Sequence, residues 1–407
     1  MAPDRENAPL VPRMMDQGYD RAQVDHRRAW VESITGANLD HVGQFSAPSE
    51  AMRGNIENLI GTAQIPIGVA GPLEVHGEHA QGVFYVPLAT TEGALVRSYE
   101  RGMVALTRSG GVQARIHENQ NRVAPVFSFG DVAAAHEFAV WLGTVDGEIK
   151  AEADSTTRHG RLERIEVFPV GRDVMVNLRF HTADAHGMNM IVKAADKACR
   201  WIMANSRALR YLVFSGLESE KHASGFLFPG GKGKKVVAGA LLPAATCRTY
   251  LHATPADFAV LWKHTVIGHV HAGAQGYNGH FANGLTAMFI ACGQDVANVV
   301  NSAIGITNFE VTEAGDLYAS VTLPALTVAT VGGGTGLGTG RECLEMMGCA
   351  GSGGSGKLAE IFAAAVLAGE LSMGAAIASG EFVAAHETYG RNRPKEAASE
   401  VDHDGQG

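Results

Sequence analysis

The stretch Asn58–Leu73 (NLIGTAQIPIGVAGPL), with the run Thr90–Val96 (TTEGALV) that follows it, decides how this 407-residue chain is interpreted. Alternating glycine and proline fix tight turns in the apolar first segment. Threonine before glutamate is a common helix start, with Thr91 as the predicted N-cap. Each piece alone is ordinary structure. In succession they predict a constrained apolar loop that leads to a carboxylate, Glu92, in the first turn of a helix.

The composition predicts a globular protein of two or three domains. Hydrophobic residues make up 46% of the chain and charged residues 18%, which suffices for several cores. The formal net charge of −9, without a long Lys/Arg run, argues against a nucleic acid or a membrane surface as partner and favours a small molecule. The cysteines show no paired spacing, and the sequence has neither a signal peptide nor an apolar run of about 18 residues. We therefore expect a cytoplasmic protein with reduced thiols.

The texture of the sequence predicts an α+β fold in which a smaller domain is inserted into a larger one. Residues 1–55 are polar and weakly helical in pattern, which predicts an N-terminal helical arm. Residues 124–213 change to short alternating runs between helices, which predicts an inserted α+β domain. The flanking segments 56–123 and 214–391 are predicted to form one large, mainly helical domain that ends in an alanine-rich helix. The charged segment 392–407 is predicted to be a flexible tail.

Two carboxylates are candidates for chemistry. Glu92 at a helix start is explained either by the helix dipole or by function. Asp295 lies in a segment predicted to be one helix, and it borders the buried face of that helix. A buried charge needs a partner, because leaving it unpaired costs roughly several kcal/mol. That partner is either a structural one such as Asn298 or a catalytic cation whose charge Asp295 would tune.

Lys221 and His386 are candidates of the opposite charge. Lys221 lies in the polar loop Ser215–Gly225 between the predicted domains, where it is either a solvated charge or a displayed catalytic group. His386 ends the last long helix. There it is either a C-terminal cap favoured by the helix dipole or a proton donor that titrates near neutral pH.

Phosphate-binding signals occur at several places. The segment Asp184–Met190 opens a helix after a strand, so its free N–H groups could hold a phosphate. Upstream, Arg158 offers a guanidinium for an adenosine 2′-phosphate. The loop Gly351–Lys357 nearly matches a phosphate-binding loop, but Leu358 stands where a hydroxyl would bind Mg²⁺, so we predict a helix connection there. No histidine spacing indicates a metal, and none is expected.

In this order, the motifs resemble those of hydroxymethylglutaryl-CoA reductases from about Asn58 to His386. In that family the catalytic Glu lies in Thr-Thr-Glu-Gly, which Glu92 matches, and the catalytic Asp lies in Gly-Gln-Asp, which Asp295 matches. The catalytic Lys follows the cofactor domain, as Lys221 does, and the catalytic His lies near the C-terminus, as His386 does. The resemblance therefore implies a four-residue catalytic set.

The resemblance also implies a reaction. Hydroxymethylglutaryl-CoA would be reduced by two NADPH, through a hemithioacetal and an aldehyde, to mevalonate and CoA. Lys221 would polarise the thioester carbonyl and Asp295 would keep that lysine charged and oriented. Glu92 would donate a proton to the aldehyde oxygen, and His386 would protonate the departing CoA thiolate.

Binding residues carry over from the family by position. Those implied for NADPH are Thr157, Arg158, Asp184, Gly187, Met188, Asn189, Met190, Gly333 and Gly334. Those implied for the substrate are Arg122, Ser215, Glu220, Asn283, Ser98, Arg101 and Lys263. Arg158 favours NADPH over NADH, because a guanidinium fork fits a phosphate.

Some positions depart from the family pattern. His222 and His264 stand where the family has lysines, and Glu220 replaces an Asp. Imidazole carries less charge at pH 7 than ammonium does. One alternative is therefore a related NAD(P)H-dependent reductase of a different acyl-CoA thioester. Another, suggested by the loop Gly351–Lys357, is a non-catalytic CoA- or nucleotide-binding protein.

The resemblance further implies a subclass and an assembly. The motifs are similar to those of the family's first class, in a soluble, bacterial-type form. Family members place their active sites between subunits, so a homodimer or a homotetramer is expected.

Overall fold

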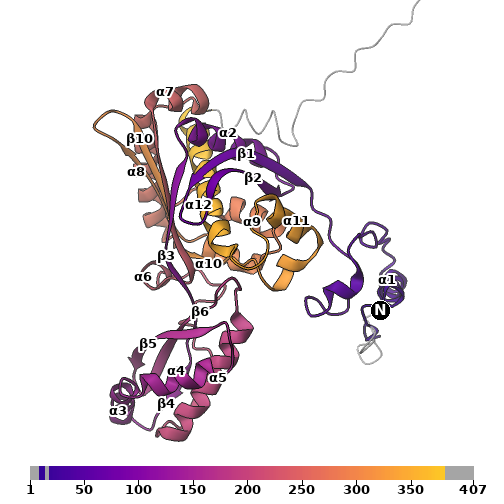
Figure 1. Ribbon diagram of the computed structural model, residues 1–407, viewed down its shortest axis with the longest axis vertical. Helices are drawn as coiled ribbons and strands as arrows, with labels where there is room; N and C mark the ends of the chain where they lie inside the picture. The colour runs from indigo at the N-terminus through magenta and orange to yellow at the C-terminus, as the bar shows by residue number, and fades with distance from the viewer. Residues whose placement is uncertain (1–8, 14–17, 381–407) are drawn as a thin grey trace, which may run out of the picture.

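The computed structural model describes residues 9–13 and 18–380, which form a large body, a smaller body and an N-terminal arm (Figure 1). Its mixture of helices and sheet agrees with the predicted α+β class. The predicted catalytic residue His386 and the predicted flexible tail 392–407 lie outside the described residues.

The large body is built on a sheet that runs through its whole width. The strands are β1 (Ile67–His76), β2 (Gln81–Ala89), β3 (Val112–Val123), β8 (Gly233–Leu242), β9 (Ile306–Val311) and β10 (Leu317–Leu326). Their order is β2-β1-β3-β8-β10-β9, in which β1 and β3 are parallel and the other neighbours antiparallel. Helices still hold more residues of this body than strands do, as expected, but the extent of the sheet was not predicted. Strand β10 gives a weak strand signal because it contains alanines and a proline.

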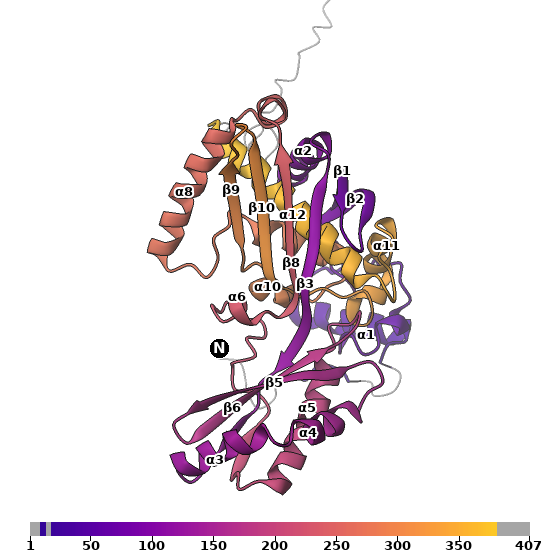
Figure 2. The same cartoon turned by 60° about the vertical axis from the view of Figure 1, so that its left-hand side comes forward.

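Helices pack on this sheet (Figure 2). The long helix α12 (Ser355–Ala378) contacts β3, β8 and β10, and it also packs against α2 (Leu95–Arg108) and α9 (Phe281–Ala291). Helix α8 (Pro255–Ala272) lies beside the edge strand β9. The shorter elements of this body are α6 (Leu227–Gly230), α7 (Ala244–Thr246), the π-helical turn η2 (Cys247–Leu251), η3 (Val296–Asn298), α10 (Val299–Ser302), η4 (Gly333–Gly336) and α11 (Gly338–Met346).

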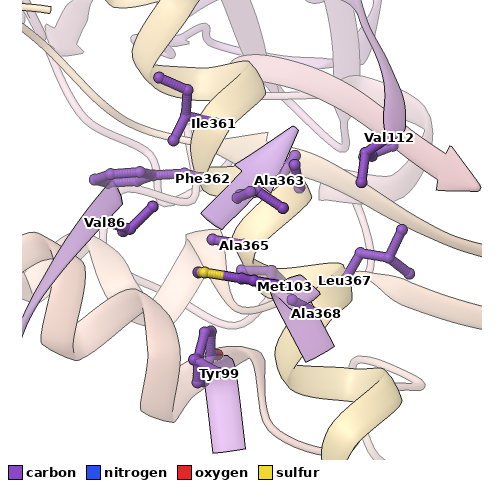
Figure 3. Packing of buried hydrophobic residues seen from close by; sticks show 14 of the residues in the cluster. Val86, Tyr99, Met103, Val112, Ile361, Phe362, Ala363, Ala365, Leu367 and Ala368 are labelled. Atoms are coloured by element: carbon purple, nitrogen blue, oxygen red, sulfur yellow. The ribbon is translucent and has the colours of Figure 1, made fainter. Parts of the chain in front are cut away.

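Helix α12 forms the centre of the main core (Figure 3). Its side chains Ile361 and Phe362 pack in the same cluster as Val86, Tyr99 and Met103. By length and composition α12 could cross a membrane, but 83% of its most apolar window is buried inside the protein. It is therefore placed here as a core helix, and its many alanines let neighbouring backbones come close.

The smaller body has its own core and its own part of the sheet. Its elements are β4 (Val126–Ser128), α3 (Val132–Leu142), α4 (Asp146–Asp154), β5 (Arg161–Val170), β6 (Asp173–His181), α5 (Met188–Asn205) and β7 (Arg210–Leu212). The strand order is β7-β4-β6-β5, all antiparallel, which is the split βαβ arrangement of ferredoxin-like domains. Strand β3 joins the bodies, because its last residues, Asn121–Val123, pair with β6.

The N-terminal arm contains α1 (Arg21–Thr35) and the short helix η1 (Ser49–Met52). Val24, Met52 and Leu59 form a small core of their own, and Leu337 from the large body packs against it. The arm stands to one side of the large body (Figure 1).

Close packing of α2 on α12 leads to a stability prediction. A Cβ atom at Gly102 would lie 1.9 Å from the carbonyl oxygen of Ala368. We expect Gly102→Ala to lower the free energy of unfolding by about 3 kcal/mol, because one of the two helices must move. The matched control is Gly268→Ala, also in a helix, where a Cβ would meet nothing within 4 Å. This control should be neutral or stabilising by up to about 1 kcal/mol. Urea unfolding measures both; equal stability of the two variants would contradict the packing argument.

Candidate active site

Glu92, predicted to be catalytic, and Asn283, predicted to bind substrate, together form one half of the candidate site. The side-chain amide of Asn283 donates to both carboxylate oxygens of Glu92, at 3.0 and 3.2 Å. Both residues line a cavity of about 360 Å³ that also takes in Ile65 and Ile290. Glu92 is exposed, so a ligand in this cavity can reach its carboxylate.

Glu92 precedes helix α2 and does not lie in its first turn. Ala94 has φ +71° and is the N-cap, so α2 begins at Leu95. The predicted N-cap Thr91 is wrong, because a residue in the left-handed region cannot continue a right-handed helix. The hydroxyl of Thr90 accepts the N–H of Glu92 at 2.9 Å. Glu92 is therefore displayed on a loop.

Lys221 and Asp295 form the other half. Their Nζ and Oδ2 atoms are 2.9 Å apart, and each side chain is 43% exposed. Lys221 has φ +57°, an unusual conformation for lysine of the kind that clusters at functional sites. The amide of Asn298 also donates to Asp295, at 3.1 Å. The structural partner and the cationic partner of Asp295 thus occur together.

Asp295 lies between two helices. Helix α9 ends at Ala291, and Gly293 with φ +63° turns the chain. Asp295 then caps η3 by accepting the N–H of Ala297 at 3.2 Å. The expectation of one continuous helix through Asp295 is wrong, because a glycine in the left-handed region ends α9.

Helix α9 separates the two halves. Asn283 lies in the first turn of α9, and Asp295 lies beyond its C-terminal end. The eight steps from Asn283 to Ala291 alone span about 12 Å at the helical rise. A single chain therefore holds Glu92 and Lys221 at opposite ends of α9.

A buried ion network lies directly behind Lys221. Lys232 has a fully buried side chain, and its Nζ is 2.6 Å from Glu220 and 2.8 Å from the amide oxygen of Asn121. Asn121 in turn donates to the carbonyl of His186 at 2.8 Å. The His186 ring is 3.6 Å from Glu220. The network therefore ties the loop of Lys221 to the segment that opens α5.

The electrostatics of this network follow from its partners. Burial alone would raise the pKa of Glu220, but the interactions with His186 and Lys232 outweigh it and lower this pKa to about 2. Glu220 thus faces inward as a permanent anion. The sequence analysis missed Lys232. Its signal was a lysine held between Gly231 and Gly233, at the start of a strand that also contains Lys234 and Lys235.

Arg122 is buried, and its guanidinium lies 4.8 Å above the ring of Phe226. None of its three side-chain nitrogens has a hydrogen-bond partner among the described residues. Burial, reinforced by the nearby charge of Arg179, lowers the pKa of Arg122 to about 10. A buried cation with open donors is a site for an anion.

The other predicted substrate residues are distributed over the large body. Ser98 and Arg101 on α2 both contact the hydroxyl of Ser372, at 3.1 and 2.9 Å. Lys263 is exposed on α8, at the opposite edge of the sheet from β2 (Figure 2). Two further residues lie near Lys221: Ser215, whose hydroxyl accepts the N–H of Leu217 at 3.4 Å, and His222, whose Nδ1 is 2.6 Å from the Glu220 carbonyl.

The predicted cofactor residues of the smaller body meet at the start of α5. Gly187 has φ +73°, and a Cβ there would lie 2.9 Å from Thr182. Helix α5 begins at Met188 and carries Asn189 and Met190 in its first turn. The Thr157 hydroxyl lies 3.0 Å from the sulfur of Met190. This contact brings the exposed neighbour of Thr157, Arg158, close to the helix start.

The glycine-rich loop with Gly333 and Gly334 packs beside the chain segment of Asp295. A Cβ at Gly293 would lie 2.3 Å from the Gly334 carbonyl oxygen, so only glycine fits. The loop lines a cavity of about 580 Å³, and Val331 pairs with Ala185 just before α5. The described cofactor motifs are therefore gathered on the Lys221 side of α9.

Asp184 caps the N-terminus of α12. Its carboxylate accepts the N–H groups of Gly353 and Ser355, at 2.8 and 3.2 Å. Burial opposes the charge, but these hydrogen bonds outweigh it and lower the pKa of Asp184. The loop Gly351–Lys357, whose sequence resembles a phosphate-binding loop, is thus already occupied by the carboxylate of Asp184. It connects α11 to α12, as predicted. The predicted contact of Asp184 with cofactor stays a prediction.

Comparison with known proteins establishes the family. The family profile described as hydroxymethylglutaryl-coenzyme A reductase matches residues 23–391. The 3-hydroxy-3-methylglutaryl-coenzyme A reductase of Pyrococcus horikoshii is 43% identical over 385 residues, 92% of this chain and 93% of that protein. The enzyme of the same name from Aeropyrum pernix is 43% identical over 374 residues, 90% of this chain and 89% of that protein. This chain belongs to the hydroxymethylglutaryl-coenzyme A reductase family.

A solved structure shares the fold. The class II 3-hydroxy-3-methylglutaryl-CoA reductase of Streptococcus pneumoniae, determined with bound NADPH in open conformations, matches with a TM-score of 0.66. The match covers 89% of this chain and 100% of that chain, at 18% identity.

The buried network predicts a pH-dependent stability. A carboxyl whose folded pKa lies below its unfolded value adds stability above the unfolded pKa, and this stability is lost as the pH falls through the folded pKa. For Glu220 that window runs from about 4.5 down to about 2. We expect Glu220→Gln to lower the free energy of unfolding at pH 7 by about 3 kcal/mol, because Lys232 loses its buried counter-charge.

Urea unfolding at pH 7, 5, 4 and 3 checks this, with the exposed Glu313→Gln as control. The difference between the wild type and Glu220→Gln should shrink below pH 4.5, while the control stays flat. A difference that is constant with pH would rule out a charge effect.

Proposed function

We propose that this protein reduces 3-hydroxy-3-methylglutaryl-CoA to mevalonate and CoA with two equivalents of NADPH. The observation that carries the proposal is the ion pair between Lys221 and Asp295, which adjoins the glycine-rich loop of Gly334. A cation held by a carboxylate beside a dinucleotide site suits a reaction in which hydride transfer creates an oxyanion.

The described residues support distinct roles. Lys221 polarises the thioester carbonyl and stabilises the oxyanion, and Asp295 keeps its ammonium charged and aimed. Glu92 donates the proton to the aldehyde oxygen, oriented by the amide of Asn283. His386, outside the described residues, is the proposed acid for the CoA thiolate.

We further propose that Arg122 binds the free carboxylate of the substrate. It is buried and lacks any hydrogen-bond partner among the described residues, so an incoming anion would satisfy donors that are otherwise unmet. Ser215 is proposed to contribute to this subsite, whereas Lys263 lies on α8 beside β9 and makes no hydrogen bond with Arg122 among the described residues. Glu220 is proposed to act indirectly, through its ion pair with Lys232. Ser98 and Arg101 are proposed to bind the CoA part of the substrate.

The proposed cofactor is NADPH. The glycine-rich loop of Gly333 and the start of α5 are proposed to hold the dinucleotide, and Arg158 is proposed to hold the 2′-phosphate. Support comes from the contact of Thr157 with Met190, which places Arg158 next to that helix start. Asn189 and Met188 offer free N–H groups there.

We propose a homodimer, or a homotetramer built from such dimers, with the active site between subunits. Glu92 and Lys221 lie at opposite ends of α9, so a complete site needs the Glu92 half of one chain and the Lys221 half of another. The surface beside Glu92 supports this. Ile67, Val69 and Tyr85 on β1 and β2 are all roughly half exposed, an apolar face of the kind that subunit contacts cover.

The proposed subclass is the family's first class. Identity to the class II structure is 18%, and Lys221 lies in the loop between the two bodies. The relatives named above are archaeal, so the bacterial-type label is not carried further.

Loss of nicotinamide absorbance, with mevalonate quantified at the end, tests the reaction. Two NADPH consumed per mevalonate are expected, with slower turnover on NADH because Arg158 has no phosphate to bind. Lys221→Ala should lower kcat by at least about 100-fold with a preserved fold, since it removes the charge opposite the oxyanion.

Turnover of an acyl-CoA without the distal carboxylate in preference to hydroxymethylglutaryl-CoA would support the alternative reductase, for which His222 and His264 are the motive. Unchanged turnover of Lys221→Ala would contradict the mechanism.

A further inference from the structure

Glu370, in the middle of helix α12, has a carboxylate that is almost completely buried. Its Oε2 accepts the N–H of Gly279 at 2.9 Å and the hydroxyl of Thr307 at 2.7 Å. Its Oε1 accepts the N–H of His280 at 2.7 Å. Burial raises the pKa of Glu370, and these three donors counteract that effect. The group is therefore held by the backbone just before α9.

The held segment leads directly to the catalytic half-site. His280 is the N-cap of α9, and its carbonyl accepts the N–H of Asn283 at 3.1 Å. Asn283 is the residue whose amide grips Glu92. A continuous path of hydrogen bonds therefore runs from Glu370 through the start of α9 to Glu92.

The surroundings leave this segment little freedom. The ring of Tyr99 stacks on that of His280, with centroids 5.4 Å apart and planes 20° apart. The Tyr99 hydroxyl lies between α9 and α12, where a Cβ at Gly284 or at Gly369 would come within 1.7 or 2.6 Å of it. Helix α9 thus cannot slide toward α12 if its tether is cut. It can only rotate or move away, and either motion displaces Asn283.

We propose that Glu370 is a positioning residue that fixes the N-terminus of α9 and so holds Asn283 against Glu92. The inference deepens the proposed reduction and rests on it. Glu370 lines neither of the two cavities described above. Its chemistry is that of an acceptor: two backbone N–H groups and a hydroxyl need two carboxylate oxygens, and a glutamine would set its own N–H₂ against one of these donors.

The same helix contains a matched control. Glu360 is also fully buried, and it accepts the N–H groups of Glu78, His79 and Ala80 at 2.7–2.9 Å. These donors belong to the turn between β1 and β2, away from the Glu92 cavity. Glu360→Gln and Glu370→Gln therefore remove the same kind of acceptor from two buried positions of one helix, ten residues apart.

Steady-state kinetics and thermal unfolding of both variants test the proposal. Both should lower Tm to a similar extent, since each strands a buried N–H donor. Only Glu370→Gln should lower kcat, by about tenfold or more, which corresponds to a loss of at least ~1.4 kcal/mol in transition-state stabilisation. The KM for NADPH should stay within about twofold, because the cofactor motifs lie on the other side of α9.

A double-mutant cycle with Asn283→Ala separates positioning from general destabilisation. If Glu370 acts through Asn283, then Glu370→Gln should cost little further kcat in the Asn283→Ala background. Fully additive losses, or an equal kcat loss in Glu360→Gln, would overturn the proposal.

A readout that needs no turnover keeps this test apart from that of the reaction itself. Amide hydrogen exchange over Phe281–Leu285 should speed up in Glu370→Gln and stay at the wild-type rate in Glu360→Gln. Unchanged exchange in Glu370→Gln would overturn the positioning role. A wild-type protein that fails to oxidise NADPH with hydroxymethylglutaryl-CoA, yet shows this exchange pattern, would refute the proposed function alone.

Discussion

Burial of helix α12 is the constraint on which the rest of the structure depends. The helix fills the core of the large body, and polar groups along it hold neighbouring segments, some of which belong to the candidate site and some of which do not. Its N-terminus is capped by Asp184 from the smaller body. Glu360 accepts backbone N–H groups of the β1–β2 turn, and Glu370 accepts those at the start of α9. The hydroxyl of Ser372 accepts a hydrogen bond from Arg101. Buried acceptors of this kind must be satisfied, so each fixes the position of a neighbouring loop.

The sequence alone indicated much of the chemistry. The motifs of Glu92, Lys221 and Asp295 predicted a catalytic set, and the structure places Lys221 against Asp295; the catalytic roles stay predictions. The change of texture after β3 predicted the smaller body. The local backbone conformation was harder to predict. Ala94 with φ +71° delays the start of one predicted helix and Gly293 with φ +63° ends the other. A positive φ at alanine could not be predicted, because residues other than glycine adopt it only rarely.

The contacts of buried polar groups were the second feature that could not be predicted from the sequence. Glu370 lies in an alanine-rich segment whose periodicity predicts only a core helix. The segment gives no indication of which backbone N–H groups its carboxylate would bind. The loop Gly351–Lys357 illustrates the converse. Its pattern resembles an anion site, and it does bind an anion, because Gly353 of this loop contacts the carboxylate of Asp184, 169 residues earlier in the chain. Contacts at such separation follow from the fold, so they could not be predicted locally.

The division of the site by α9 links the fold to the proposed assembly. Each chain has its Glu92 half and its Lys221 half at opposite ends of α9. Mixing Glu92→Gln with Lys221→Ala, two separately inactive variants with different tags, tests this most directly. After subunit exchange in a dimer, about a quarter of the wild-type activity is expected, because half of the dimers are mixed and each of these has one intact site of two. No recovery in mixed dimers isolated through both tags would contradict an active site shared between chains.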